Sequence, residues 1–537
     1  MKRAITSSYI LTLPLGHVEI WQRDSLDKIF RVCGNMSNNL IADRLKALKE
    51  LERTKRWKEN HSAIQELCEE RNSKLKGSDE KKCEKIAGEY KEKLTPLYEM
   101  RNKLLKEFDF TEFAFQARIQ KWRAHHKHLV HTHIAQKLAS QVWKKFEDYF
   151  FGDGKEIKFI PWTEFTSIEG KSNNTGIFYK KDILRINKLK LAVKSARGPK
   201  KGRTASSSYI YEQCAMQSRI KFCRLVRRWY PEGWRYFVQF ILEGDPPRKV
   251  NPETGELLYP MGSGCVGHDI GPQTLAVVGN KAADLVELAP GAQNIEKQLR
   301  VINRAMDRSK RAMNPELFNK DGTIKRIDKL PPHCVDKRGR RIWKFSKRYQ
   351  RLAGIRRFLY RQQAAIRIQQ HHEFANRYLL YGDTHYIETM SFKGLAKRAK
   401  KTETKPGEKQ KCRKRFGKSI ANKAPAAFVN ILERKVLDNG GKFYRINTWK
   451  AKASQYNHLD HTYKPKKLSQ RWNIMPDGWR IQRDLYSAFL IQHTNADLDG
   501  FVQDFCDKDY ENFVMLHDNV VKLLMGKNHP SSMGVKN

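Results

Sequence analysis

The amino-acid sequence predicts an α+β protein of several domains, because helix-type and strand-type patterns occupy separate stretches of the chain. Its 537 residues suffice for roughly two to four domains, and a hydrophobic content of 39% can fill sizeable cores. Residues 36–149 repeat apolar positions at three- and four-residue spacing, whereas residues 150–260 hold short β-type runs between Gly, Asn and Pro turns. Residues 261–495 then alternate strand and helix patterns.

The charge of the chain indicates its partner. Lys and Arg total 104 against 58 Asp and Glu, which gives a formal net charge of +46 at pH 7. This excess is spread along the chain, so we expect a polyanionic partner. The sequence has no run of about 18 apolar residues and no amphipathic anchor stands out at either end. Nucleic acid is therefore favoured over an anionic membrane.

The N-terminus and the cysteines indicate the compartment. The apolar run in "MKRAITSSYILTLPLG" is too short for a signal peptide, so we expect a cytoplasmic protein of a prokaryotic cell. The nine cysteines have no regular spacing, which predicts reduced thiols. No two cysteines are separated by two residues, so the sequence cannot build a zinc ribbon of the CxxC type.

A small β-barrel is predicted for residues 1–35 and 150–260. The simplest topology has the N-terminal strand "SYILTLP" completing a barrel with later runs such as "WRYFVQFILEG". The helices of residues 36–149 would then be a lobe inserted into the barrel. In this lobe "FTEFAFQARIQKWRAHHKHLVHTHI" mixes aromatic and cationic residues, which suits nucleic-acid contact, although simple packing explains any single residue equally well.

The element order of residues 261–495 is more specific. "GCVGHDIGPQTLAVVG" and "AADLVELA" predict a meander of three strands, and long helical stretches follow it. "GDTHYIETMSF" predicts a fourth strand, "APAAFVNILERKVLDNGG" an amphipathic helix closed by glycine, and "KFYRINTW" a fifth strand. "WRIQRDLYSAFLIQH" predicts the last helix. This succession is that of the RNase H-like fold.

Carboxylates occur where such a fold would bring them together. The first strand, the fourth strand and the last helix carry Asp269, Glu388 and Asp484. Convergence on divalent cations would explain a charge in an apolar strand, and oxygen-only ligands suit Mg²⁺ or Mn²⁺. Two ions roughly 4 Å apart would activate water and stabilise the leaving 3′ oxygen of a phosphodiester, leaving 5′-phosphate products. Each residue alone has a structural explanation, and the spacing supports Glu388 least.

The same segment resembles the transposon-encoded RNA-guided nuclease TnpB and the compact type V CRISPR effectors related to it. The resemblance covers most of residues 261–495. It is carried by "GHDIGPQTLAVV", "RSKRAMNPELFNKDG", "YIETMSFKGLAKRAKK", "RFGKSIANKAPAAFVNILERK", "INTWKAKASQYNH" and "QRDLYSAF". It implies that Asp269, Glu388 and Asp484 are the catalytic, metal-binding triad of a RuvC nuclease domain.

The sequence departs from that family in the lid over the site. Many relatives carry a zinc ribbon there, and here Ser454 and Gln455 remain while residues 451–480 have no cysteine. Structural zinc is therefore not expected, and we expect aromatic residues such as Trp472 and Trp479 to hold the lid together. His458 and His461 lack thiol partners for a metal site.

Two further departures flank the predicted triad. Tyr486 replaces the usual Asn of the last motif, and His268 replaces a common aliphatic residue. These changes concern local packing.

The resemblance also implies wedge and recognition lobes in the N-terminal half, which hold a guide RNA and read a short motif in duplex DNA. Residues 341–372 contain no acidic residue, so their helix can contact the backbone of a guide-target heteroduplex. The nucleic-acid contacts predicted on this helix and on the basic loop after it are Arg348, Arg351, Arg356, Arg357, Lys397 and Arg398.

Together these features predict an RNA-guided endonuclease that cleaves double-stranded DNA next to a short recognition motif, with one copy per guide or a dimer. Two alternatives remain open: a guide-directed DNA-binding repressor that does not cleave, and an unguided transposase or nuclease of the same fold. Residues 496–537 are an acidic C-terminal tail, which we expect to form a solvated helix or to cover a basic groove.

Overall fold

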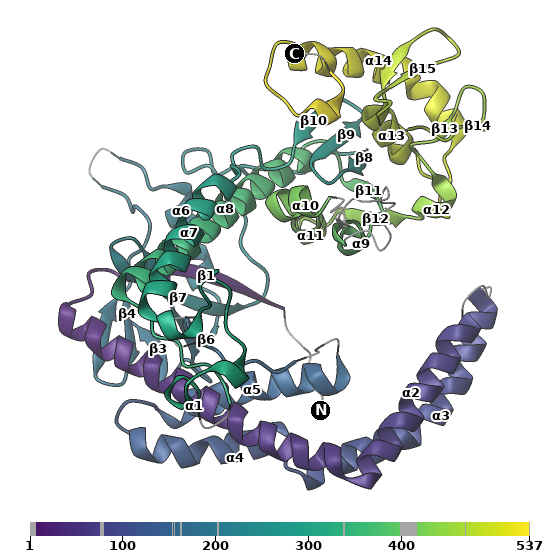
Figure 1. Ribbon diagram of the computed structural model, residues 1–537. Helices are drawn as coiled ribbons and strands as arrows, with labels where there is room; N and C mark the ends of the chain where they lie inside the picture. The colour runs from purple at the N-terminus through teal and green to yellow at the C-terminus, as the bar shows by residue number, and fades with distance from the viewer. Residues whose placement is uncertain are drawn as a thin grey trace. The chain divides into compact units, whose positions relative to one another are not determined.

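The computed structural model describes residues 7–75, 80–152, 154, 156–161, 164–200, 203–336, 339–397, 416–467 and 469–535. Figure 1 shows a mixed α/β chain, which divides into two compact units, Met1–Gly255 and Glu256–Asn537. No helix in the described part of the chain combines the length and apolarity needed to span a membrane.

The first unit combines antiparallel strands with long helices. One sheet has the order β1-β7-β6-β2 and a second has the order β3-β4-β5. The strands are β1 (Ser8–Pro14), β2 (Ser167–Glu169), β3 (Ile177–Lys180), β4 (Ile183–Ile186), β5 (Leu189–Ala192), β6 (Ile220–Tyr230) and β7 (Gly233–Glu243). The N-terminal strand pairs with β7 along its whole length, and a bridge between Leu15 and Val193 links the two sheets.

The helices of this unit lie in the sequence between β1 and β2, apart from α6. They are α1 (Ile20–Arg53), α2 (Lys55–Leu75), α3 (Glu80–Glu107), α4 (Glu112–Arg123), α5 (Thr132–Phe151) and α6 (Ser207–Met216). The boundary between residues 35 and 36 that the sequence suggested falls inside α1. One continuous helix crosses this boundary, and it packs both on the strands and on the other helices.

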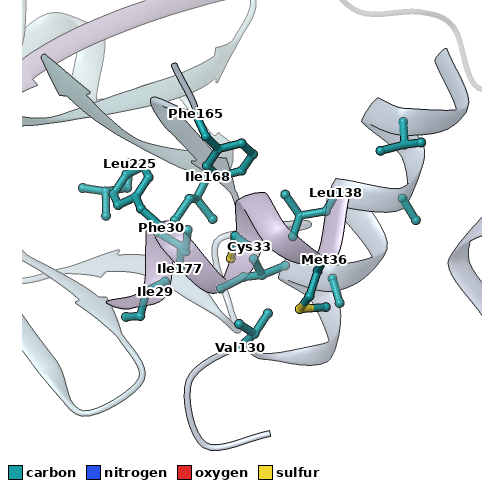
Figure 2. Packing of buried hydrophobic residues seen from close by; sticks show 14 of the residues in the cluster. Ile29, Phe30, Cys33, Met36, Val130, Leu138, Phe165, Ile168, Ile177 and Leu225 are labelled. Atoms are coloured by element: carbon teal, nitrogen blue, oxygen red, sulfur yellow. The ribbon is translucent and has the colours of Figure 1, made fainter. Parts of the chain in front are cut away.

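The core of this unit explains why α1 spans that boundary. Figure 2 shows Phe30 and Cys33 of α1 packed among Ile168 and Ile177 of the strands and Leu138 of α5. All five side chains are buried. Apolar residues at three- and four-residue spacing on α1 therefore join the sheets and the helices in one hydrophobic cluster. Closure of these sheets into a barrel stays a prediction.

The second unit is built on a sheet of order β10-β9-β8-β11-β12. Its strands are β8 (Cys265–Ile270), β9 (Thr274–Gly279), β10 (Ala283–Glu287), β11 (Thr384–Glu388) and β12 (Lys442–Ile446). Strands β8, β9 and β10 pair antiparallel, whereas β11 runs parallel to both β8 and β12. The elements follow the order that the sequence predicted: three strands, helices, a strand, helices, a strand and a last helix.

Helices cover both faces of this sheet, as the unbroken apolar run in β9 requires. Leu275 and Val277 point into a cluster with α8 and α11, while Ala276 and Val278 point into a cluster with α13 and α14. The helices of this unit are α7 (Glu296–Met313), α8 (Lys347–Leu379), α9 (Phe392–Ala396), α10 (Gly417–Lys423), α11 (Pro425–Asp438), α12 (Thr448–Ala451), α13 (Arg483–Gln492) and α14 (Gln503–Leu524).

Short strands and one long helix complete the second unit. The predicted lid contains two small antiparallel pairs, β13 (Tyr456–Asn457) with β14 (Thr462–Tyr463), and β15 (Trp472–Ile474) with β16 (Arg480–Gln482). The helix expected in the acidic tail is α14, but it is not fully solvated. Phe513 is buried and stacks on Phe489 of α13 at 4.4 Å between ring centroids. Most acidic residues of α14 are exposed, whereas Asp509 pairs with the buried His493 at 3.0 Å and the apolar face of the helix is part of the core.

Candidate active site

Asp269 and Glu388 lie side by side at one edge of the second sheet. Asp269 is near the end of β8 and Glu388 ends β11. The parallel register pairs His268 with Ile387, so the two carboxylates follow directly in neighbouring strands. Alternation along each strand places both on the face that α13 covers, because Val266, Ile270 and Ile387 occupy the opposite face with α8 and α11.

Asp484 reaches the same place from α13, in the first turn of that helix. The close approach of α13 to β8 depends on Gly267. A Cβ atom at Gly267 would lie 2.0 Å from the carbonyl oxygen of Ala488 and 2.4 Å from the backbone nitrogen of Gln492. Any side chain at residue 267 would therefore push α13, and Asp484 with it, away from the sheet.

The three carboxylates line one pocket of about 450 Å³. Arg471, Arg483 and Lys466 line it as well, together with Ser454 and Gln455 of the predicted lid. The pocket therefore combines groups that attract a cation with groups that attract an anion. Ser532, which follows α14, also contributes to the wall, so the end of the second unit is part of the site.

The carboxylates destabilise one another's charged forms. Burial raises the pKa of Asp269 well above its usual value, and the neighbouring charges of Asp484 and Glu388 raise it further, while Arg483 and Arg471 oppose this effect. Burial also raises the pKa of Glu388, to about 7. Near neutral pH the pocket therefore retains protons that a bound divalent cation would displace.

Two arginines hold the carboxylate of Asp484. Its Oδ1 accepts hydrogen bonds from Nε of Arg483 at 3.1 Å and from Nη2 at 2.9 Å. Nη1 of Arg471 lies 3.7 Å from Oδ2. Arg483 also donates from Nη1 to the carbonyl oxygen of Gln470 at 3.1 Å, which fixes the guanidinium in the pocket wall. The orientation of Asp484 is therefore set by its cationic neighbours.

The donor set fits a hard divalent cation. Asp269, Glu388 and Asp484 offer only carboxylate oxygens, which Mg²⁺ and Mn²⁺ prefer. In the described part of the chain, however, their oxygens do not all lie within 4.8 Å of one another. The hydrogen bonds from Arg483 hold the carboxylate of Asp484 in this arrangement.

The lid is attached to α13 by a buried hydrogen-bond pair. The hydroxyl of Tyr486 lies 2.6 Å from Nδ1 of His458 and accepts a hydrogen bond from the backbone nitrogen of His458 at 3.0 Å. His458 is buried, and burial lowers its pKa to about 4. Tyr486 therefore binds the histidine that the sequence left as a possible metal ligand. His461 lies outside this contact, 3.4 Å from the hydroxyl of Tyr456.

The second departure, His268, also has a structural partner. It is buried on the opposite face of β8, where its Nε2 lies 2.8 Å from Nδ1 of His385. The two rings stack with centroids 5.1 Å apart. His268 thus packs β8 against β11 and does not line the pocket.

The described basic residues among those predicted to contact nucleic acid do not line the pocket. Arg348 and Arg351 are exposed near the start of α8, and Lys397 is exposed after α9. Arg356 and Arg357 are partly buried, and Nη1 of Arg356 donates to Asn303 of α7 at 3.2 Å. Arg398 lies outside the described residues.

Sequence reasoning missed the cationic half of the pocket. Arg483 precedes Asp484 directly in "QRDLYSAF", so its position beside the carboxylate could have been recognised. Arg471 and Lys466 lie in a stretch without periodicity, and no signal in the sequence places them near Asp269.

Comparisons with known proteins give structural likenesses only. No protein-family model matches the chain, and no curated protein matches it. Among solved structures, a CRISPR-Cas12f ternary complex shares 12% identity over 89% of this chain and 83% of that chain, with a TM-score of 0.25. A Cas12f1-sgRNA-target DNA complex shares 12% identity over 91% and 99%, with a TM-score of 0.22. A Cas12i(E894A)-crRNA-dsDNA complex shares 9% identity over 93% and 65%, with a TM-score of 0.23.

Proposed function

We propose that this chain is an RNA-guided DNA endonuclease and that the pocket of the second unit hydrolyses phosphodiester bonds. The observation that carries the proposal is the meeting of Asp269, Glu388 and Asp484 with Arg471 and with other cationic side chains in one pocket. Carboxylates alone would suit a site that only binds a cation. Carboxylates beside cations suit a reaction in which a cation and an anionic substrate are held together.

The sheet supports a nuclease of the RNase H-like type, as in RuvC domains. An antiparallel meander followed by parallel β11 and β12 places two carboxylates at one sheet edge, and α13 supplies the third. Bound Mg²⁺ or Mn²⁺ would supply activation of water and stabilisation of the leaving 3′ oxygen.

The side chains of the pocket have distinct roles in this proposal. Arg471 and Lys466 attract the nonbridging oxygens of the scissile phosphate. Arg483 is a positioning residue, because its hydrogen bonds fix the carboxylate of Asp484. Glu388, with a pKa of about 7, can hold or release a proton at neutral pH.

The proposed binding of a guide RNA and a DNA target rests on the charge of the chain and on the family resemblance. A net charge of +46 far exceeds what a single phosphodiester pocket needs. Arg348 and Arg351 are exposed on α8, and the structure gives neither of them an ion pair with a described residue. We therefore propose that the chain binds a guide RNA and duplex DNA with an adjacent motif, mainly through their backbones.

Replacement of Asp269 tests the nuclease. Asp269→Asn keeps the shape of the side chain but removes a charge that the cation needs. We expect Mg²⁺-dependent cleavage to fall by about 100-fold or more, while RNA and DNA binding stay unchanged. The matched control is Asp284→Asn, on β10 of the same sheet and outside the pocket. Cleavage by Asp269→Asn at the wild-type rate would contradict the proposal.

Sequencing the RNA that copurifies with the protein tests the guide. The protein is expressed with its native flanking DNA and purified, and the RNA bound to it is extracted and sequenced. One abundant species with a constant structured part and a variable end is expected. RNA that matches the cellular background would favour the unguided nuclease. A specific RNA with no Mg²⁺-dependent cleavage of matching DNA would favour the repressor.

A further inference from the structure

Residues 314–346, which connect α7 to α8, have too small a core for their length. Among their described residues, only Asn314, Leu317 and Cys334 are buried. The segment instead contains short 3₁₀ turns and two isolated bridges, Phe318 with Ile324 and Val335 with Arg341. Segments that bury so little apolar surface are commonly stabilised by a disulfide or a metal ion.

A cluster of metal-ligating side chains joins the 3₁₀ turn Pro315–Leu317 to the 3₁₀ turn Pro332–Cys334. Nε2 of His333 lies 2.6 Å from Oε2 of Glu316, and Sγ of Cys334 donates to the same oxygen at 3.1 Å. The ligand atoms of all three lie within 4.8 Å of one another, and they form the only such group in the described part of the chain.

We propose that Glu316, His333 and Cys334 bind a zinc ion that ties the two turns together, with water as the fourth ligand. Thiolate, imidazole and carboxylate are the ligands that Zn²⁺ takes in proteins, and three protein ligands plus water complete a tetrahedron. The thiol disfavours Mg²⁺, so this site is chemically distinct from the carboxylate pocket. The proposal does not depend on the nuclease function.

Zinc would replace the hydrogen bonds that now link the cluster. Binding requires the thiol of Cys334 to lose its proton and Nε2 of His333 to offer a lone pair, so one proton leaves the thiol as the Zn–S bond forms. Glu316 and His333 are exposed, which leaves the ion a path to the site. The hydrogen bond to Glu316 raises the pKa of the Cys334 thiol, and the charges of Lys344 and Lys325 offset this only in part.

Metal analysis of the full-length chain tests this site. We would dialyse the purified protein against buffer with Zn²⁺ and then without it, and measure zinc per chain by mass spectrometry. About one equivalent is expected in the wild type, and almost none in Cys334→Ser. Cys214→Ser changes an exposed cysteine in the first unit and should keep the zinc. Asp269→Asn with Glu388→Gln should also keep it, because those residues lie in the other pocket.

A second readout separates a lost ligand from a misfolded variant. His333→Asn alters an exposed side chain, and the Co²⁺-loaded wild type should show thiolate-to-metal absorption that both His333→Asn and Cys334→Ser lose. Treating the wild type with chelator should increase protease cleavage within residues 314–346 to the level of Cys334→Ser. The proposal is overturned if the wild type retains no zinc, if Cys334→Ser retains as much as the wild type, or if only the Asp269 and Glu388 replacements remove it.

Discussion

Asp484 is a buried carboxylate whose charge is balanced by neighbouring arginine side chains. Arg483 is itself buried, so removing its guanidinium takes away both hydrogen bonds to Oδ1 and leaves the Asp484 carboxylate only the more distant Arg471 as a cationic partner. We expect Arg483→Leu to lower the free energy of unfolding by about 3–5 kcal/mol in the absence of metal. Urea unfolding of the wild type and the variant measures this difference in the free energy of unfolding. Arg434→Leu, which breaks an exposed pair with Asp438, should cost about 1 kcal/mol or less.

A double replacement shows whether the charge is responsible. If the cost arises from an unpaired carboxylate, Asp484→Asn should restore much of the stability lost in Arg483→Leu. Equal losses in the single and double variants would mean that packing of the arginine stem, and not its charge, stabilises the pocket.

Glu388 makes stability depend on pH. Burial raises its pKa from 4.5 to about 7, so the folded chain keeps a proton that the unfolded chain has released. Without divalent cations, the free energy of unfolding should therefore fall as pH rises from about 4.5 to about 7, by on the order of 3 kcal/mol. Urea unfolding across this range measures the slope.

Glu388→Gln is the control for this pH dependence, because it removes the titrating group. Its slope should be clearly smaller, although Asp269 still contributes in the same direction. Added Mg²⁺ should flatten the wild-type slope, since a cation favours the charged carboxylates. A wild type that gains stability between these pH values would contradict the burial of Glu388.

At the scale of elements, the lid depends on the hydroxyl of Tyr486. Tyr486→Phe removes the hydroxyl that meets both the backbone nitrogen and Nδ1 of His458. Leaving these buried groups without that partner should cost about 1–3 kcal/mol, mostly as local opening of the lid. Hydrogen exchange of residues 456–463 should become faster. Tyr463→Phe, at an exposed position, should leave the exchange unchanged.

The order of elements in the second unit could be predicted from the sequence because its patterns are local. The apolar run of β9, the glycine after α11 and the spacing in α13 each specify an element without distant contacts. α1 shows the limit of such patterns, since its periodicity does not reveal that its start packs on strands. In α14 the spacing of Tyr510, Phe513 and Val514 was visible, but acidic residues obscured it.

The candidate site could be predicted only in part. Asp269 stands out because carboxylates are rare in apolar strands, whereas Glu388 is supported mainly by the order of elements. Arg471 and Lys466 enter the pocket through tertiary packing, which no periodicity encodes. The cluster of Glu316 with His333 and Cys334 joins residues of different turns, so a search for CxxC pairs could not find it. The structure places the three predicted carboxylates in one pocket, and their catalytic role stays a prediction.

At the scale of the molecule, charge should dominate nucleic-acid affinity. Each phosphate contact releases counterions, so affinity should fall steeply as salt rises. We expect Arg348→Gln combined with Arg351→Gln to reduce the slope of log affinity against log salt by about 2. Fluorescence anisotropy with the copurified RNA measures the slope. Arg377→Gln is the control, since Arg377 already pairs with Asp284 at 2.9 Å.

If the double variant changes the salt slope no more than Arg377→Gln does, Arg348 and Arg351 do not contact phosphates. The remaining basic surface would then carry the affinity, and the proposed role of α8 would be wrong.

The three carboxylates come from β8, β11 and α13, and Ser532 beyond α14 closes part of the same wall. The ribosome therefore adds the third carboxylate after the other two, and Ser532 later still. A chain whose synthesis stops after β12 carries Asp269 and Glu388 but lacks Asp484. On the proposed function, prematurely terminated copies would lack nuclease activity however well their first unit folds.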